Sequence, residues 1–120
     1  MNTLQDRHAH MVLCLAKRGE DIINEMSVED AHLLHMAVGI SGEAGELLDA
    51  IKKRAIYQKE LDRENIIEEL GDLEFYIQGI RMQLRISREE CLEHNLQKLA
   101  RRYIDFNYTN QAAIDRADKA

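Results

Sequence analysis

Two pairs of acidic residues have the same spacing in this sequence. Glu43 and Glu46 are three positions apart, and so are Glu69 and Asp72. Residues three apart on a helix share a face, so each pair would present two carboxylates together. Antiparallel packing of two such helices would gather four carboxylates whose repulsion demands neutralisation. Hard oxygen ligands in this number suit Mg²⁺ or Mn²⁺, with phosphate oxygens completing the coordination. The alternative interpretation is four ordinary, solvated surface acids.

Glycine is concentrated in the same two acidic segments. Each glycine in a helix interior costs roughly 0.5–1 kcal/mol relative to alanine, so a cluster of them calls for a reason. One interpretation is clearance for a ligand beside the carboxylates, and the other is close packing of two helices. The glycines concerned are Gly39, Gly42, Gly45, Gly71 and Gly79.

Cationic and polar residues that suit an anion recur at regular positions. Lys53 lies in a basic run about two turns after the first acidic pair, and Asn95, Lys98 and Arg102 share a helix face. Such groups would stabilise a phosphate chain whose other end meets a metal ion. The alternatives are complementation of a helix dipole for the basic run and a solvated face for the other three. Tyr76, one turn beyond the second acidic pair, suits either a base or sugar contact or the core.

Amphipathic periodicity predicts the elements that carry these residues. The chain contains no proline, which favours long helices. Ser27, Asp62 and Ser87 are expected N-caps, and Gly19 is expected just after the end of the first helix. Four amphipathic helices with short connections indicate an all-α, antiparallel four-helix bundle-like core. The helices are expected at about 3–18, 28–55, 63–86 and 88–103, within a single domain at 1–106, followed by a polar tail at 107–120 that is a short helix or partly disordered.

The composition excludes several classes of protein. The 120 residues suit one domain, and a net charge of −6 argues against a nucleic-acid-binding surface. The sequence has no run of 18 apolar residues, and its polar N-terminus lacks a signal core, so neither a membrane span nor secretion is expected. Cys14 and Cys91 are isolated, which is typical of reduced thiols. Together these features predict a cytoplasmic protein.

Three stretches in this order resemble one known family. "GEAGELLDAIKK", "IIEELGDLEFYI" and "NLQKLARRY" resemble the all-α nucleoside triphosphate pyrophosphatase superfamily, specifically a small stand-alone MazG-like protein. The shared pattern is E-x-x-E, a gap of 22 residues, E-x-x-D, and then N-x-x-K-L-x-x-R-Y. The resemblance covers about residues 32–106, and its specificity comes from the combination.

The resemblance implies hydrolysis of a (deoxy)nucleoside triphosphate between the α and β phosphates, for nucleotide-pool control or house-cleaning. It implies a homodimer or homotetramer with sites near subunit interfaces, and it leaves the preferred base open. Glu43 and Glu46 would be catalytic, with Glu43 the candidate general base that orients the attacking water. The implied metal ligands for Mg²⁺ (or Mn²⁺) are Glu43, Glu46, Glu69 and Asp72, and the implied substrate contacts are Lys53, Tyr76, Asn95, Lys98 and Arg102.

Two other functions are compatible with a helical bundle that carries acids. A non-catalytic metal- and nucleotide-binding sensor or interaction module of the same fold would keep all four acids, and the sequence does not distinguish it from an enzyme. A ferritin-like di-iron bundle would need two Glu-x-x-His units. Only Glu29-x-x-His32 has that spacing, so the di-iron alternative is disfavoured.

Overall fold

All regular elements in the part of the chain that the structure describes are helical. The structure is a computed structural model, and it describes residues 3–119. The all-α prediction is confirmed. Within these residues no helix has both the length and the apolar character that a membrane crossing requires. In chain order the elements are α1 (Leu4–Leu15), α2 (Gly19–Glu25), α3 (Val28–Ala55), α4 (Arg63–Leu84), α5 (Arg88–Arg102), η1 (Ile104–Phe106), α6 (Asn110–Asp115) and η2 (Ala117–Lys119).

Side-chain caps fix the starts of the three longest helices where the sequence predicts them. Ser27 Oγ accepts a hydrogen bond from Asp30 N–H at 3.0 Å, and the Asp30 carboxylate accepts one from Ser27 N–H at 3.2 Å. Ser87 and Glu90 form the same capping box at the start of α5. Asp62 accepts a bond of 3.1 Å from a backbone N–H in the first turn of α4. Each cap satisfies N–H groups that have no partner inside the helix.

Two helix ends differ from the prediction. Gly19, expected to follow the first helix, is instead the first residue of α2, because the chain already becomes extended at Ala16 (φ −70°, ψ 129°). α4 ends at Leu84 rather than at about residue 86. Arg85 adopts a left-handed conformation (φ 56°), and its N–H donates back to carbonyls of the last turn. These breaks depend on single-residue conformations that hydrophobic periodicity does not reveal.

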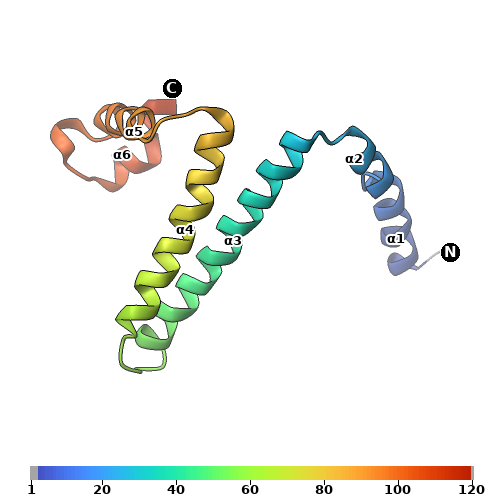
Figure 1. Ribbon diagram of the computed structural model, residues 1–120, viewed down its shortest axis with the longest axis horizontal. Helices are drawn as coiled ribbons and strands as arrows, with labels where there is room; N and C mark the ends of the chain where they lie inside the picture. Colours follow the sequence, from blue (N-terminus) through green and yellow to red (C-terminus); the bar gives the residue numbers. More distant parts are fainter. Residues whose placement is uncertain (1–2, 120) are drawn as a thin grey trace.

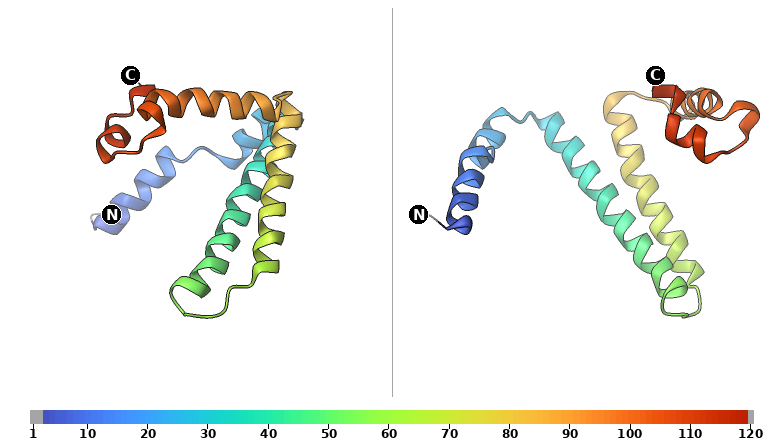
Figure 2. Two further views of the ribbon diagram at one scale, coloured as in Figure 1. Left: turned by 90° about the vertical axis from the view of Figure 1, so that its left-hand side faces the viewer. Right: turned by 180° about the vertical axis from the view of Figure 1, so that it is seen from behind.

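The two long helices pack side by side in antiparallel orientation and are joined by the loop 56–62 (Figure 1). α1 and α2 lead away from the N-terminal end of α3, and α5 leaves the end of α4 at a steep angle (Figure 2). The short C-terminal elements pack on α5. Among the described residues, Met36 and Ala50 are the only buried apolar side chains. One chain therefore supplies one antiparallel helix pair of the predicted bundle.

Two glycines let α3 and α4 approach each other closely. A Cβ at Gly39 on α3 would collide with the ring of Tyr76 on α4, and a Cβ at Gly79 on α4 would collide with Met36 on α3. Each helix thus places one large side chain against a glycine of the other. These reciprocal contacts set the register of the pair, since a shift would press each large side chain against a bulkier neighbour.

Candidate metal centre

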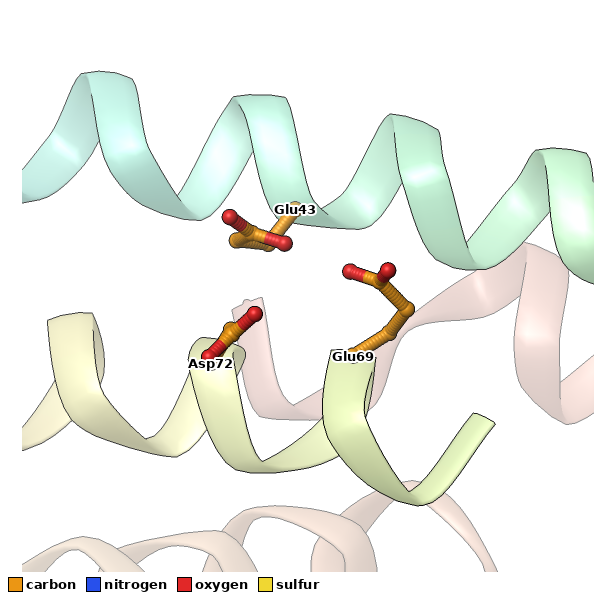
Figure 3. Close-up of side chains that lie close together, drawn as sticks. All are labelled: Glu43, Glu69 and Asp72. Carbon is orange, nitrogen blue, oxygen red and sulfur yellow. The ribbon is translucent and has the colours of Figure 1, made fainter. Parts of the chain in front are cut away.

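Three of the four predicted acids meet between the long helices. α3 supplies Glu43, and α4 supplies Glu69 and Asp72. Each offers one carboxylate oxygen, and these oxygens all lie within 4.8 Å of one another. Figure 3 shows the three side chains extending from the two helices into the space between them. Glu69 is buried, Glu43 is half-buried and Asp72 is exposed, so the cluster lies at the edge of the helix interface.

The buried carboxylates lack hydrogen-bond donors. Oε2 of Glu43 and Oε2 of Glu69 are buried and have no hydrogen-bond partner among the described residues. The adjacent carboxylate of Glu43, followed by burial and the charge of Glu46, raises the pKa of Glu69 to about 7. Buried polar atoms without partners are costly, and crowded like charges resist ionisation. A hard divalent cation would satisfy both oxygens and offset the repulsion, so this donor set fits Mg²⁺ or Mn²⁺.

An open cavity of about 490 Å³ adjoins the cluster. Glu46 and Lys53 line this cavity together with Glu69, so two further predicted residues lie beside the buried acid of the cluster. Lys53 Nζ is 3.1 Å from Asp49 Oδ2, one helical turn earlier. Asp49 was not among the predicted residues, although it follows Glu46 by three positions and so repeats the spacing of the acidic pairs.

The glycines divide into two groups at this site. Gly42 and Gly45 line the cavity, and a Cβ on either would meet nothing within 4 Å. Gly71, between the two acids of α4, also borders open space. Close helix packing therefore accounts for Gly39 and Gly79, whereas Gly42 and Gly45 border open space beside the carboxylates.

Tyr76 lies in the interface between the long helices. Its ring is half-buried and makes edge contacts with Phe75 and His35, with centroid separations of 5.1 and 6.3 Å. Tyr76 does not line the cavity beside the carboxylates. Its contacts are those of a packing residue, while Phe75, which sequence analysis did not single out, is 67% exposed next to it.

The three predicted phosphate contacts on α5 lie elsewhere in the single chain. Asn95 and Lys98 line a separate cavity of about 490 Å³ along α5, and no α5 residue lines the cavity beside the carboxylates. Arg102 forms a bidentate ion pair with Asp118 of η2. Asp118 was missed by sequence analysis, because it lies 16 positions away in a segment without a recognisable motif.

Comparisons with known proteins give one finding. Residues 29–105, nearly two-thirds of the chain, match the MazG nucleotide pyrophosphohydrolase domain. No curated protein and no solved structure gives a significant match. The matched residues include α4, nearly all of α3, the whole of α5 and all the acids of the cluster. The chain therefore belongs to the MazG nucleotide pyrophosphohydrolase domain family.

Proposed function

We propose that the chain hydrolyses a (deoxy)nucleoside triphosphate between the α and β phosphates, in the presence of Mg²⁺ or Mn²⁺, to the nucleoside monophosphate and pyrophosphate. The observation that carries this proposal is the carboxylate cluster, in which the buried Oε2 atoms of Glu43 and Glu69 have no partner among the described residues. Membership of the family supports the reaction type. We propose a cytoplasmic location, as the sequence predicts, and a catalytic domain at 1–106, whose first two residues lie outside the described part.

In this proposal all four carboxylates bind the metal ion, and one of them also accepts a proton. Glu43, Glu46, Glu69 and Asp72 would hold the ion, which when bound supplies charge neutralisation for the phosphates and a lowered pKa for water. Glu43 orients the water that attacks the α-phosphorus and accepts its proton. Lys53, which lines the cavity beside these acids, binds phosphate oxygens.

A second copy of the chain completes the site in this proposal. Asn95, Lys98 and Arg102 belong to α5, which leaves the end of α4 at a steep angle (Figure 2) and contributes nothing to the cavity beside the acids. We infer that these three residues contact the phosphates of a neighbouring subunit's substrate. Tyr76 would act on the nucleoside side through its position one turn beyond Asp72.

The surface of the single chain supports association into a homodimer or homotetramer. Its accessible area is 10236 Å², whereas a compact monomer of 13.9 kDa would expose about 6,700 Å². Its radius of gyration is 20.7 Å, against about 14 Å for a compact domain of this length. Obligate dimers commonly bury more than about 1,000 Å² on each subunit, so the excess area is sufficient for one or more such interfaces.

An apolar face on the α3–α4 pair is the proposed interface. On each helix, the residues of this face are offset by about a quarter turn from the residues that contact the other helix. The offset has the same direction of rotation on both helices. Because the helices are antiparallel, both stripes face the same side of the pair. All of these side chains are half-buried or exposed in the single chain. This apolar face consists of Leu33, Ile40, Leu47 and Ile51 on α3 and Ile66, Leu70, Leu73, Ile77, Ile80 and Leu84 on α4.

A panel of nucleoside triphosphates, assayed for pyrophosphate release with Mg²⁺ and with EDTA, tests the proposed reaction. We expect Mg²⁺-dependent release from at least one member, and a loss of about 100-fold or more in kcat for Glu69→Ala and Asp72→Ala. Glu74→Gln is the matched control, because this exposed acid is also on α4 and outside the cluster. Turnover that persists in Glu69→Ala and Asp72→Ala would contradict the site.

The sensor alternative predicts a different pattern in the same experiment. A folded protein that binds nucleotide with Mg²⁺ but releases no pyrophosphate from any panel member would be a non-catalytic member of the family. Isothermal titration of each nucleotide against the wild type therefore accompanies the activity panel.

A further inference from the structure

The ion pair between Arg102 and Asp118 is the least exposed ion pair among the described residues. Arg102 Nε donates to Asp118 Oδ1 at 2.7 Å, and Nη2 donates to Oδ2 at 3.1 Å. The side chains are 16% and 1% exposed, respectively. The other ion pairs among the described residues join side chains that are each more than half exposed. A bidentate, desolvated pair fixes the plane of the guanidinium as well as its position.

The pairing uses only one edge of the guanidinium. An arginine has five N–H donors in a rigid fork, and Asp118 takes one from Nε and one from Nη2. Among residues 3–119, the hydrogen bonds of this guanidinium to Asp118 use Nε and Nη2 and leave Nη1 out. The end of the fork formed by Nη1 and Nη2 therefore keeps donors for a second anion.

The surroundings restrain Arg102 further and leave space beside it. The guanidinium carbon lies 6.0 Å from the centroid of the Tyr103 ring, a cation–π contact. Arg102 also lines a cavity of about 210 Å³, whose other lining residues include Asn107 and Thr109. Both the aspartate and this cavity come from the segment after α5, which folds back on that helix. The C-terminal segment thus holds one side of the guanidinium and leaves open space beside it.

We propose that Asp118 is a positioning residue for the reaction, which holds the side chain of Arg102 so that the free edge of its guanidinium meets a phosphate oxygen of the nucleotide. This inference rests on the proposed function, because it takes Arg102 as a phosphate contact. An arginine that is oriented before the substrate arrives loses less side-chain entropy on binding. The polar tail at 107–120 then acts in substrate binding, and its last residue lies outside the described part.

Asp118→Asn tests this role, because it removes the charge and keeps the shape. We expect KM for the nucleoside triphosphate to rise by about fivefold to tenfold with kcat within about twofold, since one oriented charge-assisted contact is weakened. The dissociation constant of inorganic tripolyphosphate, measured by calorimetry with Mg²⁺, should rise by the same factor. In an Arg102→Gln background the Asp118→Asn change should alter neither value further. Asp118→Glu should restore part of the lost affinity.

Controls separate positioning from other roles of the pair. Asp115→Asn alters another tail acid, whose carboxylate accepts a bond from Gln111 within α6, and should leave both values unchanged. A lower KM in Asp118→Asn would show that the aspartate competes with the phosphate for Arg102. An unchanged KM together with reduced stability would show that the ion pair only stabilises the fold. Either result overturns the proposal. Should the wild type hydrolyse no nucleotide, the tripolyphosphate measurement still decides the role of Asp118 by itself.

Discussion

Glu69 is the most buried acidic side chain of the carboxylate cluster, and the charged groups that shift its pKa are other carboxylates. These neighbours and its burial raise its pKa from 4.5 to about 7. Between these two pH values the folded, metal-free protein holds a proton that the unfolded chain releases. The free energy of unfolding therefore falls as the pH rises through this window, and a bound cation would reverse the effect.

Thermal unfolding at several pH values checks this linkage. In EDTA we expect a lower Tm at about pH 8 than at about pH 5, and a weaker pH dependence in Glu69→Gln, which cannot ionise. Mg²⁺ should raise Tm more at the higher pH, because binding displaces the proton. The same pH dependence of Tm in Glu69→Gln as in the wild type would show that another group titrates.

At the scale of residues, short-range patterns predicted much of the candidate site. Glu43, Glu69 and Asp72 meet as their helical spacing and antiparallel packing required. The pairing of Arg102 with Asp118 was not predictable, because it depends on how the segment after α5 folds back. Local spacing gives the face on which a side chain lies, and it does not give the partner that a distant segment brings to it.

At the scale of elements, the glycines of α3 and α4 differ in whether a side chain of the other helix packs against them. Gly39 has the Tyr76 ring against it, whereas Gly42, one turn away on the same helix, has open space. Replacing either glycine with alanine should raise the free energy of unfolding by up to about 1 kcal/mol, because alanine has the higher helix propensity. Overpacking at the covered position costs typically about 1–3 kcal/mol, so the two substitutions should have opposite effects.

Urea denaturation of Gly39→Ala and Gly42→Ala measures this difference. We expect Gly39→Ala to reduce the free energy of unfolding and Gly42→Ala to increase it slightly. Because Gly42 borders the cavity beside the acids, Gly42→Ala should also raise KM if the phosphates occupy that cavity. Equal effects on stability would contradict the division of the glycines into packing and clearance positions.

The starts of helices were predictable where a side chain caps them, as at Ser27, Asp62 and Ser87. A capping motif acts within four residues, so the sequence contains the whole interaction. The breaks at Ala16 and Arg85 were not predictable, because neither carries a glycine, proline or cap signal. The same holds for the direction in which α5 leaves α4, which no local pattern encodes.

At the scale of the whole molecule, the sequence predicted apolar stripes on four helices and a bundle to bury them. One chain packs only two of its long helices together, and most apolar side chains stay exposed or half-buried. Hydrophobic periodicity shows which face of a helix is apolar and is expected to be buried. It does not show whether the burying surface belongs to the same chain or to another subunit. The apolar face of the α3–α4 pair therefore leads to a prediction about assembly.

Light scattering during size-exclusion chromatography tests that prediction. We expect a mass of two or four subunits for the wild type, rather than the 13.9 kDa of one chain. Leu70→Gln, in the apolar face, should weaken association on the order of tenfold or more, because a buried leucine contributes about 1.5–3 kcal/mol. Leu34→Gln is the matched control, since Leu34 is 52% exposed and Leu70 is 49% exposed, but Leu34 lies outside that face. A monomeric wild type would contradict the assembly.

The reciprocal contacts at Gly39 and Gly79 limit which changes of chain length the protein tolerates. Gly39 and Glu43 are one turn apart on α3, and Asp72 and Tyr76 are one turn apart on α4. A residue inserted within either turn would rotate the acid about 100° away from the packing contact beside it. The protein should therefore not tolerate insertions or deletions within these two turns. The loop 56–62, in contrast, can vary in length without separating the packing contacts from the carboxylate cluster.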